Sequence, residues 1–169
     1  MAQRMIRMTS LKLLNPALLA ATLLTIGTAN ANPYFSVVDP GTLGGSDSLA
    51  FRINDSGEFA GYSYLSGDND LHAFLYSNGV MQDLGSLTPG GSPSIAYGLN
   101  VSGAVAGVDA GSGVSRAFLY SGGTMTNLGT LGGSSATAYG INASGQIVGA
   151  SYPSNGPLHA FLYENGTMT

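Results

Sequence analysis

Short apolar runs alternate with turns rich in Gly, Asn and Ser throughout residues 34–169, and none of these runs keeps a helical period. Two such runs joined by an Asn-x-Ser-Gly turn recur at residues 50–61, 96–107 and 138–149. Asn and Ser side chains bond the backbone of a turn, and Gly accepts a positive φ at its end. Each of these segments therefore predicts two short strands joined by a tight antiparallel turn.

A second hairpin is predicted after each of these segments, beyond a loop of variable length. Its first strand reads Ala-Phe-Leu-Tyr at residues 73–76, 117–120 and 160–163. The dipeptides that follow are Asn78-Gly79, Gly122-Gly123 and Asn165-Gly166. Such pairs favour type I′ turns, because both central residues of that turn need a positive φ. A fourth strand is predicted at residues 80–85 and 124–129.

Leu43, Leu87 and Leu131 mark the period of the chain, since they recur every 44 residues and each opens a Gly- and Ser-rich junction. The predicted repeat units are residues 43–86, 87–130 and 131–169, within a β-repeat domain that spans residues 32–169. A four-stranded antiparallel sheet of this length is typical of a propeller blade. We therefore predict an all-β, propeller-like array of these units. The alternative is a β-solenoid, whose coils are shorter and whose strands are parallel.

The third strand of each unit begins with a recognisable tripeptide. It is His72-Ala73-Phe74 in the first unit and His159-Ala160-Phe161 in the last, whereas the middle unit has Arg116-Ala117-Phe118. Together with the Leu-Gly-Gly junction and the Ile-Asn turn, this pattern resembles the bacterial extracellular HAF repeat family over residues 34–169. The resemblance implies an exported protein, and it carries no activity over to particular residues.

The first residues differ from the rest in a way that is typical of a secretory signal peptide. Basic residues open the chain, an apolar run follows from Leu13 to Ile26, and Ala29-Asn30-Ala31 supplies small residues in the A-x-A pattern. The run is too short to span a bilayer comfortably. We predict cleavage after Ala31 and a secreted protein, extracellular or periplasmic, with no membrane span after cleavage. The alternative is a signal segment that stays attached as an anchor.

Removal of residues 1–31 changes the charge of the chain. The formal net charge of the whole sequence is −4, but three of its five basic residues lie in the signal segment. Arg52 and Arg116 are left against nine acidic residues, which makes the net charge −7. Such a surface repels phosphate backbones, so we expect no nucleic-acid partner. The chain has no Cys, which excludes a disulfide framework.

Three groups of polar residues suggest chemistry, and a structural role explains each of them better. His72 and His159 are matched by Arg116, which is no metal ligand here, so all three are expected to support the third strand. Asp55 and Glu58 form a carboxylate pair of the kind that glycosidases need, but they flank a solvated turn in one unit only. The stretch 68–70 lacks the Gly and Glu of a calcium loop. We therefore predict no catalytic residue, no metal site and no cofactor.

Positions that all units share are interpreted as structural, so function is expected in the loops that vary. These loops span residues 64–71, 109–115 and 152–158, and exposed Tyr in them suits stacking on sugars. The candidate ligand-binding residues are Tyr64, Asp68, Asp70, Asp109, Tyr152 and Asn155. The leading hypothesis is a non-catalytic secreted module that binds carbohydrate or protein at the cell surface or in the matrix. The alternatives are a purely structural or adhesive repeat and, third, a propeller hydrolase or lyase.

Residues 34–42 align with the fourth strand of a unit, since Asp39 takes the place of Asp83 and Asn127. This segment could lend a fourth strand to the last unit, which ends at Thr169. Three units leave sheet edges and faces uncovered, whereas closed propellers have about four to eight blades. The leading expectation is a piece of a longer repeat protein. The alternative is self-association, with two chains completing one ring.

Overall fold

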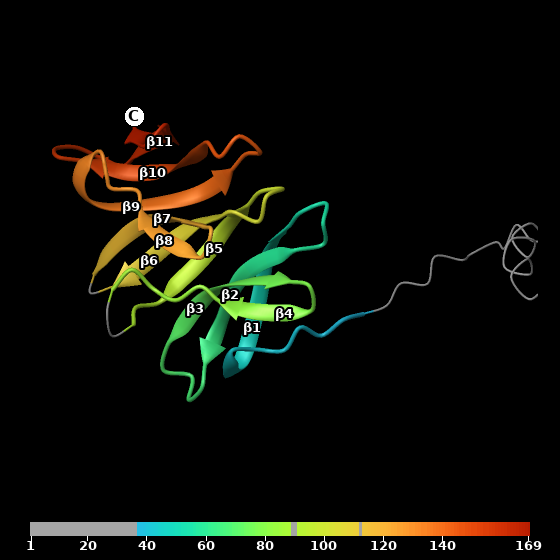
Figure 1. Ribbon diagram of the computed structural model, residues 1–169. Helices are drawn as coiled ribbons and strands as arrows, with labels where there is room; N and C mark the ends of the chain where they lie inside the picture. The colour runs from blue at the N-terminus through green and yellow to red at the C-terminus, as the bar shows by residue number, and fades with distance from the viewer. Residues whose placement is uncertain (1–36, 89–90, 112) are drawn as a thin grey trace, which may run out of the picture. The chain divides into compact units, whose positions relative to one another are not determined.

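The computed structural model describes residues 37–88, 91–111 and 113–169, so the predicted signal peptide and residues 34–36 lie outside the described part. Residues Val38–Thr169 form one compact body. Its strands make three four-stranded antiparallel sheets, and the described residues contain no helix, which confirms the all-β prediction (Figure 1). None of the described residues belongs to a helix long and apolar enough to cross a membrane.

Each sheet is a simple meander in which neighbours in sequence are neighbours in space. The first sheet contains β1 (Gly44–Ile53), β2 (Phe59–Leu65), β3 (Leu71–Ser77) and β4 (Val80–Asp83). The second contains β5 (Ser94–Leu99), β6 (Val105–Gly111), β7 (Val114–Ser121) and β8 (Thr124–Asn127). The third contains β9 (Gly132–Ile141), β10 (Ile147–Pro153), β11 (His159–Glu164) and β12 (Thr167–Met168).

The predicted turn chemistry explains why these strands meet as hairpins. In the turn between β1 and β2, the Asn54 carboxamide oxygen accepts hydrogen bonds from the backbone N–H groups of Ser56 and Glu58. Asn100 and Asn142 make the same bonds in the other sheets. Asn78 and Asn165 adopt φ values of 53° and 51° at the second hairpins, as a type I′ turn requires.

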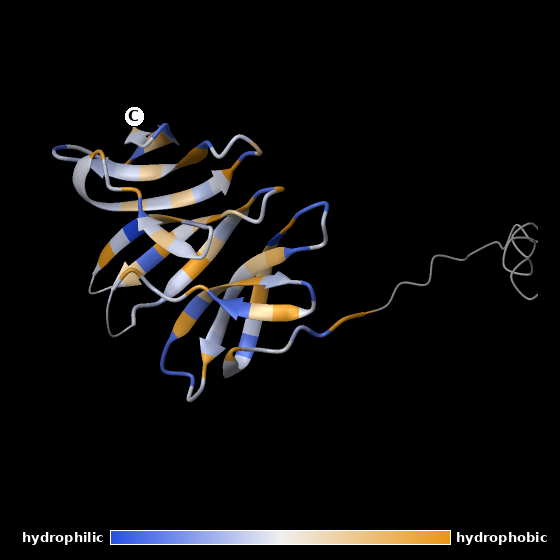
Figure 2. Ribbon diagram, in the orientation of Figure 1, coloured by the Kyte–Doolittle hydropathy of each residue, from blue (hydrophilic) through white to orange (hydrophobic). Residues whose placement is uncertain are grey.

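The sheets pack on one another and bury one apolar core at each interface. Along the strands, apolar and polar residues alternate (Figure 2). The core between the first and second sheets contains Ala60, Ala73, Leu75, Leu84, Ala96, Val105, Phe118 and Tyr120. The core between the second and third contains Ala106, Ala117, Leu128, Ala136, Ala138, Ile147 and Phe161. The same positions recur at both interfaces, since Ala106 and Ala117 of the second sheet correspond to Ala60 and Ala73 of the first.

The repeats are also joined by hydrogen bonds between equivalent residues. The Asn54 side chain donates to the carbonyl of Asn100 at 3.0 Å, and the Asn100 side chain donates to the carbonyl of Asn142 at 3.2 Å. A second recurring bond ties each junction to its sheet. The Leu43 and Leu131 N–H groups donate to Ser63 and Ser151 hydroxyls, and the Leu87 N–H donates to a carboxylate. The asparagine bonds thus join successive sheets at equivalent positions, and the junction bonds hold each junction against its own sheet.

The N-terminal segment does not lie where the sequence suggested it could. Residues 37–42 belong to no strand, and Leu43 makes only an isolated parallel bridge with Leu65. The fourth position of the third sheet is filled by β12, which pairs with β11 through Tyr163 and Glu164. The last unit therefore supplies its own fourth strand, because Thr167 and Met168 follow a turn that folds them back onto β11.

Candidate functional site

The first strand of each sheet, which is β1, β5 or β9, contains a β-bulge at the same place. In the first sheet Ala50 pairs with Gly61 and Arg52 with Ala60, so Phe51 is the extra residue. The second and third sheets repeat this irregularity, with Tyr97 and Tyr139 as the extra residues. A bulge bends its strand and re-aims a side chain, and such bulges are common beside functional sites. Each unit thus presents one aromatic residue from a bulged position.

These three rings lie side by side across the sheets. The Phe51 and Tyr97 ring centroids are 5.8 Å apart, and those of Tyr97 and Tyr139 are 5.7 Å apart. Phe51 is 37% exposed and Tyr139 50% exposed, which is high for large rings that are in mutual contact. The packing of the sheets therefore places a half-buried Tyr97 between the exposed Phe51 and Tyr139, and it builds this surface from residues about 44 positions apart, the length of one repeat.

The row continues beyond the bulges at both ends. The ring centroids of Tyr62 and Phe51 are 5.8 Å apart, and those of Tyr64 and Tyr62 are 6.1 Å apart. At the other end, Tyr139 and Tyr152 line a shallow hollow of about 130 Å³. We define the aromatic row as Tyr64, Tyr62, Phe51, Tyr97, Tyr139 and Tyr152. It crosses all three sheets and is contributed mainly by β1, β2, β5 and β9.

The hydroxyl group of Tyr97 is influenced by its place in the row. Burial raises the pKa of Tyr97, and its neighbours Tyr139 and Tyr62 raise it further. The phenol of Tyr97 therefore stays protonated at any physiological pH and can donate a hydrogen bond. A row of aromatic rings that also carries phenol hydroxyl groups is suited to an uncharged ligand with polar edges.

Two of the residues proposed from the sequence belong to this row, and four do not. Tyr64 and Tyr152 are its two ends. Asp109 is fully buried, where its carboxylate accepts from the Leu87 N–H at 2.8 Å and lies 3.5 Å from the Arg116 guanidinium. No ligand can reach this carboxylate, because the β-sheet packing of the repeat encloses it.

The remaining loop residues serve local structure or face solvent. One carboxylate oxygen of Asp68 accepts from the Ser46 N–H at 2.7 Å, and one of Asp70 accepts from the Leu71 N–H at 2.8 Å. Asn155 is exposed in the bend that precedes β11. Among the described residues, no cluster of three His, Cys, Asp or Glu side chains could hold a metal ion. The two aspartates are thus features of their loop.

The other polar candidates also have structural partners. Glu58 accepts hydrogen bonds from Ser77 and from the Asn54 side chain, and these bonds lower its pKa. The His72 Nδ1 atom lies 2.9 Å from Asp83, at the start of β3 where support of the strand was expected. Neither Glu58 nor His72 belongs to the aromatic row.

The sequence contained the signal for this site, but its meaning depended on the structure. An aromatic residue follows Ala50, Ala96 and Ala138 in every unit. Repetition alone indicated a structural role, because shared positions usually form the core. The pairing register decides otherwise, since it places the residue after each alanine in the bulge, while the alanine itself is buried in the second and third sheets.

No protein-family model matches the chain, and a search of the curated proteins finds no match. The described residues define a class of protein by themselves. It is an all-β repeat protein in which three four-stranded antiparallel sheets stack and jointly display a row of aromatic rings.

Proposed function

We propose that the chain is a secreted, non-catalytic repeat module that binds an extended, uncharged carbohydrate along the aromatic row. The single observation that carries this proposal is the row of Phe51, Tyr97 and Tyr139 across three sheets, in which neighbouring ring centroids are 5.7–5.8 Å apart. That spacing is comparable to the length of one sugar unit in an extended polysaccharide. The axial C–H groups of a sugar ring pack on aromatic faces, and its hydroxyl groups bond phenols.

Charge favours a neutral ligand over an anionic one. Without the signal segment the chain has a net charge of −7, which opposes the approach of acidic polymers. The members of the row supply aromatic rings and phenol hydroxyl groups, and none is a carboxylate or an imidazole. The row is therefore chemically suited to hold a ligand without transforming it.

The same proposal includes the class and compartment inferred from the sequence. The stacked meanders support a propeller-like array rather than a solenoid, because every sheet is antiparallel and each unit forms one sheet of its own. The tripeptides at His72 and His159 support membership of the HAF repeat family. The signal pattern before Ala31 supports export to the cell surface or matrix, where polysaccharides are found.

Affinity electrophoresis and a glycan array of neutral polysaccharides test this function. We expect retardation by at least one extended neutral glycan. Tyr139→Ala should weaken binding by about tenfold, the loss of roughly one stacking contact. Tyr139→Phe should retain most of the affinity, because it keeps the ring.

Val80→Ala is the matched control, because Val80 is exposed on β4 and lies outside the aromatic row. It should bind like the unmodified chain. Binding that is unchanged in Tyr139→Ala, or no binding to any neutral glycan, would leave the row without a carbohydrate role. The second result would favour the purely structural or adhesive alternative.

A further inference from the structure

Among the described residues, no further sheet covers the outer face at either end of the stack, and these two faces repeat the positions that are buried at the internal interfaces. The outer face of the first sheet is defined by Ala50, Ile53, Phe59, Phe74 and Tyr76. The outer face of the third sheet is defined by Val148, Ala160 and Leu162. In the second sheet the corresponding positions are covered on both sides by neighbours.

Several residues on the outer face of the first sheet are more exposed than their equivalents in the other two sheets. Ala50 is exposed, whereas the equivalent Ala96 and Ala138 are fully buried against the preceding sheet. Ile53 is 71% exposed, whereas the equivalent Ile141 is packed against the core. Phe59 is half-buried, although both residues at its position in the other sheets are fully buried. The outer face of the first sheet thus has the composition of an interface. Phe74 is buried there like its equivalents, but Ala50 and Ile53 lack the covering that their equivalents have.

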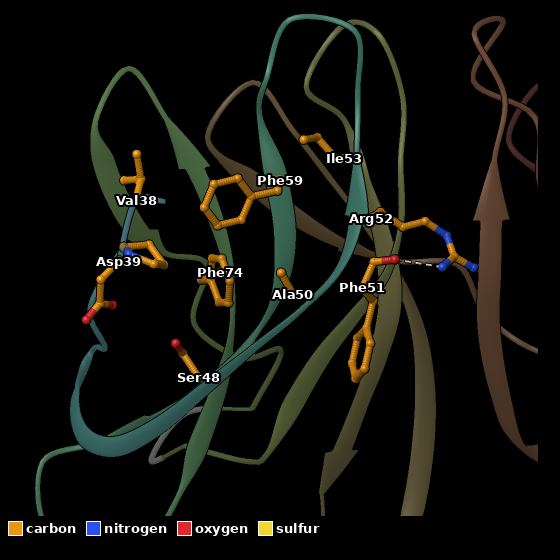
Figure 3. Close-up of a pocket in the computed structure, with 10 residues that line it drawn as sticks. Val38, Asp39, Ser48, Ala50, Phe51, Arg52, Ile53, Phe59 and Phe74 are labelled. Atoms are coloured by element: carbon orange, nitrogen blue, oxygen red, sulfur yellow. Dashed lines mark hydrogen bonds between the residues drawn. The ribbon is translucent and has the colours of Figure 1, made fainter. Parts of the chain in front are cut away.

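A hollow of about 640 Å³ lies on this face (Figure 3). Phe59 and Phe74 form part of its wall, and Val38 and Asp39 lie across from them. Pro40 also lines the hollow and takes the sequence position of Leu84, which is buried in the core between the first and second sheets. The N-terminal segment therefore borders the hollow in the same way that β4 and the next residue, Leu84, border the first core.

On the outer face of the third sheet, two residues are likewise more exposed than their equivalents in the other two sheets. Val148 is 53% exposed, whereas the equivalent Ala60 and Ala106 are buried under the following sheet. Ala160 is exposed, although both of its equivalents, Ala73 and Ala117, are fully buried. A shallow apolar depression lined in part by Gly140, Val148 and Leu162 marks this outer face. This face corresponds to the face with which the first sheet covers the second sheet and the second sheet covers the third.

The ladder of asparagine side chains ends at the same face. Asn54 and Asn100 donate to the carbonyl of the equivalent residue in the following sheet. Asn142 donates to Gln146 within its own turn at 2.6 Å, as Asn54 does to Glu58, but among the described residues it has no ladder acceptor. If a first sheet of another copy followed the third sheet, the Asn142 side chain could donate to the Asn54 carbonyl of that copy, as Asn54 and Asn100 donate to the next sheet.

We propose that a second copy of this chain docks head to tail, with the outer face of its first sheet on the outer face of the third sheet. The contact would repeat the two interfaces inside the chain, residue position for residue position. Such a contact joins two different faces, so it closes into a ring or grows into a filament. Two copies contribute six sheets, which lies within the range of about four to eight blades of closed propellers.

Light scattering coupled to size exclusion, over a wide range of protein concentration, tests the proposal. We expect the unmodified chain to form a dimer or larger species. Val148→Asp and Ile53→Asp each place a carboxylate in one of the two faces, and each should shift the protein to monomer. Val80→Asp is the matched control, since Val80 is 64% exposed on β4 and belongs to neither face. It should associate like the unmodified chain.

The outcomes separate this contact from others. Dissociation by both substitutions supports head-to-tail docking. Dissociation by only one of them would show pairing between identical faces and overturn the proposal, as would a monomer at every concentration. Circular dichroism of both variants establishes that they keep their sheets. Glycan binding by the aromatic row is measured separately, because Val148 and Ile53 are not members of it.

Discussion

Side chains on adjacent strands explain why the middle unit departs from its tripeptide. Ser63 pairs with His72 across β2 and β3, and Ser151 pairs with His159 in the third sheet. The middle unit has Asp109 opposite Arg116 at the same place. Because Asp109 is fully buried, its carboxylate needs a cation, and Arg116 Nη1 lies 3.5 Å from it. One substitution in the repeat thus requires the other.

Arg116→His should therefore destabilise the fold by about 2 kcal/mol, because it leaves the buried carboxylate of Asp109 without its guanidinium. The double variant Asp109→Ser with Arg116→His should recover most of this loss, since it recreates the pair found in the outer units. Urea unfolding of the single and double variants measures the coupling. A double variant as unstable as the sum of both single variants would contradict this explanation.

Glu58 carries a pH dependence whose sign follows from its hydrogen bonds. Ser77 and Asn54 donate to the carboxylate, and they hold its pKa below the ordinary value of 4.5. Folding therefore favours the deprotonated form. The stabilisation is complete above the ordinary pKa and is lost as the pH falls through the lowered pKa of the folded state.

Glu58→Gln is expected to lower the melting temperature at neutral pH and to match the unmodified chain in acid. Gln is compatible with this position, because Gln146 occupies it in the third sheet. Thermal unfolding from about pH 7 to about pH 3 measures the gap between the two proteins. A gap that is constant over this range would show that the carboxylate makes no such contribution.

Glycine sets the spacing between elements at the point where each bulge occurs. A Cβ atom on Gly107 would overlap the carbonyl oxygen of Ile95 and lie 2.8 Å from the Phe118 ring. Gly149 is confined in the same way by Thr137 and Phe161. The bulge, the glycine opposite it and the Phe ring over that glycine therefore form one packing arrangement, which is repeated in successive sheets.

Gly107→Ala should destabilise the protein by about 3 kcal/mol, because the backbone of β5 cannot move away without loss of pairing. Gly140→Ala is the control, since a Cβ there meets only the Val148 side chain at 3.5 Å. It should change stability by less than about 0.5 kcal/mol. Chemical denaturation of both variants compares them, and equal stabilities would refute the role assigned to Gly107.

At the scale of the whole molecule, the signal-peptide pattern before Ala31 predicts that the protein is exported. Expressed from its first residue in a bacterial host, the protein should appear outside the cytoplasm with Asn32 as its first residue. Leu23→Arg should block export, because it places a charge inside the apolar run. Amino-terminal sequencing and cell fractionation give the answer. A retained signal segment would instead support the anchored alternative.

The sequence by itself determined the elements of this protein. Hairpin turns such as Asn54–Gly57 and Asn78-Gly79 are local, since their conformation depends on a few residues with special φ values, and their period defined three antiparallel meanders. Tertiary structure decided which shared positions are buried. The bulges at Phe51, Tyr97 and Tyr139 arise from pairing register, and the row arises from stacking of sheets. Local sequence cannot encode either, because both depend on contacts between residues far apart in the chain.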